Sequence, residues 1–189
     1  ASAVGIYGMS LLYLWSGDLS LDALAMKWSE SQSVDPLAGI AVGLMLVAFG
    51  FKVGAAPFHL AAPDAYSGAS SPVAGLLATA SKAMGFVALM RILVSVTMPI
   101  EGEAFWYTAI AVIAVVTMTW GNLAALTSSN PKRMLAYSSV SHAGYMLAGL
   151  AAIGSGLGSE EAIELVLTAI VFHLAVLVIF KFGAFLVLS

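Results

Sequence analysis

The chain alternates between long apolar stretches and short polar connections. Two apolar stretches contain no charged residue, 104–131 with 28 residues and 134–159 with 26. Both exceed the roughly 20 residues that an α-helix needs to cross the hydrocarbon core of a bilayer. Three further stretches are interrupted by isolated ionisable residues and cover 35–66, 72–99 and 162–189. The pattern therefore predicts a transmembrane helix in each of these segments.

Both ends of the chain are apolar as well. Residues 1–15 are too few for a complete crossing and carry no basic residue, so they do not resemble a signal peptide. We interpret this stretch as the end of a helix that begins upstream, and the chain also stops within the apolar run 182–188. The sequence thus predicts an all-α, polytopic bundle of about six transmembrane helices. We expect a single membrane domain over residues 1–189, as an internal fragment that is truncated at both ends.

The composition supports a membrane protein and excludes several other classes. Of 189 residues, 61% are hydrophobic and only 9% are charged, with 7 Lys and Arg and 10 Asp and Glu. A soluble domain carries about 25% charged residues, so this chain could not cover a core of its size with a polar surface. A soluble enzyme, a disordered tail and a nucleic-acid binder, which needs a basic face, are therefore excluded. The absence of cysteine excludes disulfides, thiolate catalysis and iron–sulfur ligation, and the 3 histidines have no metal-ligand spacing.

The charges in the connections indicate an orientation. On one side of the membrane the loops carry acidic residues and a single lysine, and these loops are 17–34, 99–103 and 154–161. The connection between the two uncharged stretches lies on the opposite side and carries Lys132 and Arg133 without an acid. Because short loops rich in Lys and Arg stay in the cytoplasm, we expect this loop to be cytoplasmic.

Two lysines lie inside predicted spans. Lys82 follows Pro72 by ten residues, or about 15 Å along a helix, which is half of a roughly 30 Å hydrocarbon core. Inserting a lysine at that depth costs about 2.5–3.5 kcal/mol on insertion scales, so we expect the residue to have a structural or functional role. Lys52 is followed by Gly54-Ala-Ala-Pro57, and the proline is expected to break the helix. Broken membrane helices line ion paths in transporters, although both lysines could instead pair with acids on neighbouring helices.

Further polar groups interrupt the apolar spans. His173 and Lys181 are eight residues apart, close to two helical turns, so they lie on one helix face. His142 lies in the preceding span, after a cluster of serines. An imidazole exchanges protons near neutral pH, so these residues are candidates for a proton relay. The alternative is that the histidines are packing residues and that the serines close hydrogen bonds between helices.

Six motifs occur in order along the chain. The first three are FKVGAAPFHL at 51–60, PDAYSGA at 63–69 and ASK at 80–82. The next three are NLAAL at 122–126, KRMLAYSS at 132–139 and HAGY at 142–145. Together they resemble the antiporter-like proton-pumping subunits of complex I, the respiratory NADH:quinone oxidoreductase, and the second set is closer to subunit N than to subunits L and M. The resemblance covers essentially the whole chain, and the ordered set of motifs is highly specific.

The resemblance implies a fourteen-helix subunit built from two inverted repeats, of which this chain holds roughly helices six to eleven. Lys52 then matches the lysine of a broken helix, whose glutamate partner lies upstream of residue 1, and Lys82 matches the lysine of the next helix. By this resemblance Lys52 is the gated proton site. Lys82 is the central relay, which passes protons through water toward His173 and Lys181, and His142 is a further candidate.

The resemblance also implies the setting in which these residues act. The chain is expected to be a non-redox subunit of a proton-translocating NADH:quinone oxidoreductase, with other membrane subunits, lipid, protons and water as partners. No cofactor is expected in this chain, and NADH, FMN, iron–sulfur clusters and quinone are expected in partner subunits. The expected location is a bacterial or archaeal cell membrane, or the inner membrane of an organelle.

Some positions depart from the subunit N pattern. Ala61 stands where a tryptophan is usual, and Ser70 stands where a proline is common. The pairs Phe172-His173 and Phe180-Lys181 are closer to the subunit L pattern. These departures keep open a subunit of a multisubunit sodium/proton antiporter or of a membrane-bound hydrogenase. In such an antiporter, a cationic lysine would compete with the metal ion.

Overall fold

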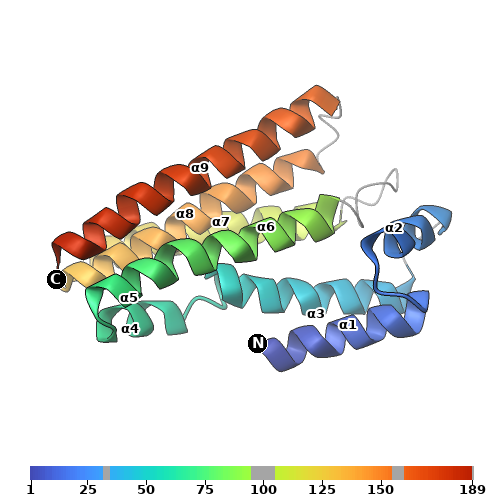
Figure 1. Ribbon diagram of the computed structural model, residues 1–189, viewed down its shortest axis with the longest axis horizontal. Coiled ribbons are helices and arrows are strands. Elements are labelled where there is room, and N and C mark those ends of the chain that lie inside the picture. The colour runs from blue at the N-terminus through green and yellow to red at the C-terminus, as the bar shows by residue number, and fades with distance from the viewer. Residues whose placement is uncertain (32–34, 95–104, 155–159, 189) are drawn as a thin grey trace. The chain divides into compact units, whose positions relative to one another are not determined.

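The computed structural model describes residues 1–31, 35–94, 105–154 and 160–188. Regular secondary structure within these ranges is helical, which confirms the prediction of an all-α fold. In chain order the elements are α1 (Ser2–Ser16), α2 (Leu21–Glu30), α3 (Pro36–Val53), α4 (Ala61–Gly68), α5 (Ser71–Leu76), the π-helix η1 (Leu77–Ser81), α6 (Lys82–Ile92), α7 (Phe105–Leu126), α8 (Pro131–Ile153) and α9 (Glu160–Val187) (Figure 1).

Four helical segments in the described ranges are long and apolar enough to cross a membrane. They are Pro36–Val53, Ser71–Ile92, Trp106–Leu126 and Glu161–Val187. α8 has 23 residues but is less apolar, because it begins next to two basic side chains and contains several serines. α1 has 15 residues. The fold is thus that of a polytopic helical membrane protein, while the total of about six transmembrane helices stays a prediction.

α3 ends well inside the apolar stretch that contains it. Its last residue is Val53, and the next helix begins only at Ala61. Gly54 has a φ of 74°, a left-handed conformation that costs glycine little and that other residues rarely adopt. The chain therefore leaves the helix at Gly54, three residues before the proline to which the sequence pattern assigned the break.

The contacts between helices divide the chain into two compact units, each described by itself. Unit 1 contains residues 1–52 and 85–103, and unit 2 contains residues 53–84 and 104–189. Lys52 belongs to the first unit, whereas the other predicted site residues belong to the second.

In unit 1, α1 packs closely against α3. A Cβ atom built on Gly5 would lie 2.9 Å from the Cβ of Ala48, and one built on Gly8 would lie 2.9 Å from the carbonyl oxygen of Ala41. Small residues allow two membrane helices to approach at this distance. The glycines of α1 are therefore part of the packing between these two helices.

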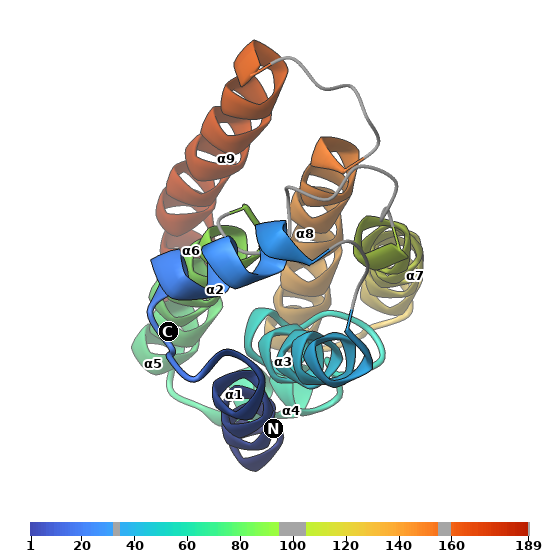
Figure 2. The ribbon, with the colours of Figure 1, turned by 90° about the vertical axis from the view of Figure 1, so that its right-hand side faces the viewer.

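In unit 2, α8 lies between α7 and α9 (Figure 2). A Cβ atom built on Gly121 of α7 would lie 2.6 Å from the backbone nitrogen of Ser141, so the backbones of α7 and α8 are in direct contact. A core cluster joins α8 to α4, α5, η1 and α9. Its buried residues, one from each of these five elements, are Tyr66, Ala74, Ala78, Ala136 and Phe185. Two serines of α8, Ser139 and Ser141, are buried between the surrounding helices.

Candidate functional site

Lys82 lies at the junction between η1 and α6, and its side chain is only 3% exposed. Its Nζ atom donates to the carbonyl oxygen of Ser139 at 2.7 Å and to the hydroxyl oxygen of Ser139 at 2.8 Å. Both acceptors are neutral oxygens of α8, and within the part of the chain that the structure describes Lys82 does not pair with an acid. An ammonium and a neutral amine can each donate two hydrogen bonds, so this site accommodates either protonation state.

A turn of π-helix directly precedes Lys82. η1 spans Leu77–Ser81, and the Thr79 hydroxyl donates to the carbonyl oxygen of Gly75 at 2.8 Å. Single turns of π-helix change the direction of the residues that follow and are frequent at functional sites. This turn sets the direction from which Lys82 reaches α8.

Lys181 of α9 reaches the same part of α8. Its side chain is 6% exposed, and its Nζ atom donates to the Ser138 hydroxyl at 2.5 Å and to the Leu135 carbonyl oxygen at 3.5 Å. Ser138 precedes the serine that holds Lys82. Two consecutive serines of one helix therefore hold two buried lysines that come from two other helices.

The histidines form a pair in the same unit. Nδ1 of His142 lies 3.2 Å from Nε2 of His173, and both rings are half-buried. One nitrogen must donate and the other must accept, so the pair shares one proton in this contact. His142 follows Ser138 by one helical turn, and the structure thus brings together Lys82, Lys181 and both histidines along α8.

Lys52 differs from the other candidates. The sequence pattern predicts a buried lysine, whereas the side chain of Lys52 is exposed within this chain. It lies one residue before the end of α3 and lines a pocket of about 390 Å³ together with apolar residues of α1 and α3, among them Ile6, Met9 and Phe49. The pocket opens beside the Lys52 side chain within unit 1.

Sequence reasoning missed Thr117, a residue of α7. Its side chain is fully buried, and its Oγ1 atom accepts a hydrogen bond from the backbone nitrogen of Ala56 at 3.0 Å. A threonine in an apolar helix is an ordinary residue, and its partner lies 61 positions away in the chain. Only the packing of α7 against the segment after α3 identifies the contact.

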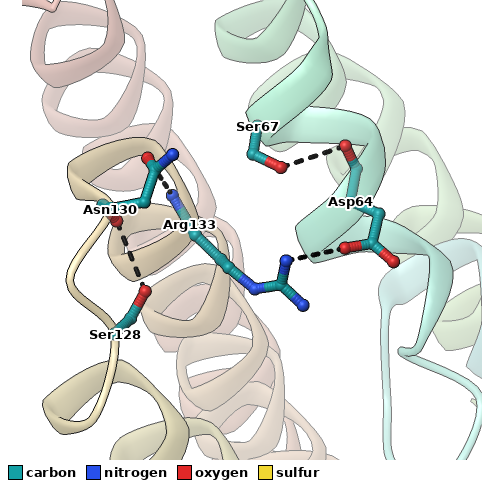
Figure 3. A network of polar contacts seen from close by, with 5 residues as sticks. All are labelled: Asp64, Ser67, Ser128, Asn130 and Arg133. Atoms are coloured by element: carbon teal, nitrogen blue, oxygen red, sulfur yellow. Dashed lines mark hydrogen bonds and ion pairs between the residues drawn. The ribbon is translucent and has the colours of Figure 1, made fainter.

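The connection between α7 and α8 is a second polar region, which Figure 3 shows. Asn130 caps α8 by accepting from the backbone nitrogens of Lys132 at 2.9 Å and Arg133 at 3.3 Å. Arg133 forms an ion pair with Asp64 of α4 at 2.9 Å. A hydrogen bond to Tyr137, together with the negative charge of Asp64, raises the pKa of Arg133, so this side chain stays charged. The two basic residues thus begin α8, and one of them is bonded to α4.

The Asn130→Ala variant is expected to lower the free energy of unfolding by about 1 kcal/mol, because it removes the cap that satisfies two free amides at the start of α8. The measurement is a titration of the purified protein with a denaturing detergent, followed by circular dichroism. Ser128→Ala is the matched control, because the Ser128 hydroxyl lies in the same connection, donates to the carbonyl oxygen of Asn130 at 3.4 Å and caps no amide. Equal stability of the two variants would contradict a stabilising role for Asn130.

Comparison with known proteins identifies relatives over the whole chain. The profile of the family described as NADH:quinone oxidoreductase/Mrp antiporter, TM, matches residues 1–189. The NADH-quinone oxidoreductase subunit N of Heliobacterium modesticaldum is 51% identical over 152 residues, which are 79% of this chain and 31% of the relative.

Chains of solved membrane complexes are also similar to this chain. A chain of respiratory complex I from Thermus thermophilus is 37% identical, with a TM-score of 0.75, over 99% of this chain and 36% of that one. A chain of the Mrp complex from Dietzia sp. is 27% identical, with a TM-score of 0.81, over 98% of this chain and 32% of that one. The 189 residues therefore span about a third of the length of these relatives.

Proposed function

Since the chain belongs to the NADH:quinone oxidoreductase/Mrp antiporter transmembrane family, we propose that it translocates protons as part of a subunit N of an NADH:quinone oxidoreductase. The observation that carries the proposal is the arrangement at Ser138 and Ser139, which hold the buried amino groups of Lys181 and Lys82. Buried ionisable side chains in membrane helices are costly, and they mark proton and ion paths.

The contacts within unit 2 support a route for the proton that begins at Lys82. The Lys82 ammonium releases its proton to water beside Ser139, and the serine hydroxyls accept and donate hydrogen bonds along the route. The proton then reaches the amino group of Lys181, with the pair of His142 and His173 as a further relay one turn away. After the proton has left, the neutral amines of Lys82 and Lys181 can still donate the two hydrogen bonds that each makes, because a neutral amine keeps two N–H groups.

Lys52 has a different role in this proposal. Its exposed position beside an open pocket leaves room for a carboxylate on a helix of the longer protein, which would make Lys52 the gated site that gains and loses an acidic partner. The redox reactions with NADH, FMN, iron–sulfur clusters and quinone belong to partner subunits. The positive charges of Lys132 and Arg133 support a cytoplasmic location for the start of α8, in a bacterial or archaeal cell membrane.

The Lys181→Met variant tests the proposal. It keeps the apolar length of the side chain but removes the amino group, so proton uptake per assembled complex is expected to fall by about tenfold or more. The measurement is the initial rate of proton uptake into vesicles that contain the whole NADH:quinone oxidoreductase. Lys27→Met is the control, because Lys27 is exposed on α2 outside the spans. Equal uptake by both variants would contradict a role of Lys181 in the route.

The second candidate is a subunit of a sodium/proton antiporter. The observation that favours it is the TM-score of 0.81 to the chain of the Mrp complex, although the sequence identity is higher for the complex I chain, 37% against 27%. The two functions differ in their partners and in their dependence on sodium. Iron–sulfur signals in the purified native assembly would support the oxidoreductase, whereas sodium-driven proton movement without such signals would support the antiporter.

A further inference from the structure

The segment that follows α3 contains buried backbone outside any helix. Ala55 and Ala56 are 1% and 3% exposed, and they lie between the end of α3 and the start of α4. A buried amide without a hydrogen-bond partner is costly, and water is scarce at such a position in a membrane protein. The conformation of this segment therefore depends on the partners of its amides.

Thr117 supplies one of these partners in a fixed orientation. Its hydroxyl donates to the carbonyl oxygen of Ile113 at 2.5 Å and accepts from the backbone nitrogen of Ala56 at 3.0 Å. Because the single hydroxyl proton is directed toward Ile113, a lone pair of the oxygen is directed toward the amide. The side chain is completely buried, so water does not compete for either contact.

The same segment contacts Lys82. A Cβ atom built on Gly54 would lie 3.5 Å from Nζ of Lys82 and 3.9 Å from its Cε atom, which means that the left-handed turn at Gly54 lies directly beside the amino group. Gly54 is two residues away from the amide that Thr117 holds. A change in the contact between Thr117 and Ala56 would thus move the backbone that lies next to Lys82.

We propose that Thr117 is a positioning residue for proton transfer at Lys82. It holds the unwound segment 54–57 so that the turn at Gly54 lies beside the amino group and leaves a defined space for the water that takes the proton. Thr117 does not carry the proton itself, because its hydroxyl proton is bonded to Ile113. This inference rests on the proposed role of Lys82, and it adds a residue from another helix to that site.

The test compares Thr117→Val, which keeps the shape of the side chain but removes the hydroxyl, with Thr117→Ser, which restores it. Thr117→Val is expected to lower proton uptake per assembled oxidoreductase by about fivefold, the equivalent of one hydrogen bond of roughly 1 kcal/mol. Thr117→Ser is expected to pump at close to the wild-type rate. Thr119→Val is the matched control, because Thr119 lies on the same helix with an exposed side chain.

Two results would overturn the inference. The first is wild-type uptake by Thr117→Val, and the second is equal impairment of Thr117→Val and Thr117→Ser, because the hydroxyl would then not be the cause. If Thr117→Val does not assemble, the Gly54→Ala variant tests the inference instead. It adds a methyl group 3.5 Å from Nζ of Lys82, at a backbone conformation that is strained for alanine. Reduced uptake by the assembled Gly54→Ala complex supports the inference, and wild-type uptake overturns it.

Lys82→Gln separates this inference from the proposed function. Full proton uptake by Lys82→Gln would contradict the proposed function itself. Loss of uptake in Lys82→Gln together with wild-type uptake in Thr117→Val would contradict only the role of Thr117.

Discussion

Lys82→Arg is expected to assemble and to lose proton uptake by about a hundredfold, within the range that general acid–base groups contribute. Arginine keeps the positive charge but effectively never releases its proton, so it cannot serve as a relay. Its planar guanidinium is also larger than the amino group that fits the two acceptors on Ser139, at 2.7 and 2.8 Å. The measurement is proton uptake by vesicles that contain the assembled oxidoreductase.

The control for this substitution is Lys27→Arg, because Lys27 lies on α2 with an exposed side chain and is expected to tolerate the change. Wild-type uptake by Lys82→Arg, with assembly verified, would show that Lys82 supplies a fixed charge and not a transferable proton. Lys82→Gln should reproduce the loss seen with arginine, because neither side chain can release and rebind a proton under these conditions.

Gly121→Ala is expected to destabilise unit 2 by about 3 kcal/mol and to reduce the amount of assembled protein strongly. The new methyl carbon would lie 2.6 Å from the backbone nitrogen and 2.9 Å from the Cα atom of Ser141, and backbone atoms cannot move aside as a flexible side chain can. The helices α7 and α8 would have to separate, and the polar residues of α8 would move with them. Detergent titration and the yield of assembled complex measure the effect.

Gly183→Ala is the matched control for this prediction. It also replaces a helical glycine by alanine, but a Cβ atom built on Gly183 meets nothing within 4 Å. Alanine is the better helix former by about 1 kcal/mol, so this variant should be at least as stable as the wild type. Equal stability of Gly121→Ala and Gly183→Ala would contradict the close packing of α7 against α8.

The sequence predicts a buried Lys82 inside a membrane span, and the side chain is 3% exposed within a helical segment long enough to cross a membrane. Its partner could not be predicted in the same way. Ser139 lies 57 positions further along the chain, and nothing in the local pattern distinguishes it from the other serines of α8. The choice among them depends on the rotation of α8 about its axis and on the π-helical turn before Lys82.

The exposure of Lys52 could not be predicted for a related reason. The apolar sequence around it correctly predicts a membrane helix, but hydropathy does not say which face of that helix is covered by other helices. In unit 1 the glycines of α1 bring that helix against α3, and the space at the end of α3 remains open beside Lys52.

The sequence by itself determined the class of the protein and the list of its candidate residues. The cost of placing a side chain in hydrocarbon depends on that side chain alone, so apolar stretches and the ionisable residues within them can be recognised residue by residue. The tertiary structure alone decided that consecutive serines hold Lys82 and Lys181, that the two histidines meet, and that Thr117 holds the segment beside Lys82. These contacts join residues 31 to 61 positions apart, and hydrogen bonds are directional at about 3 Å, so only the packed helices determine which groups meet.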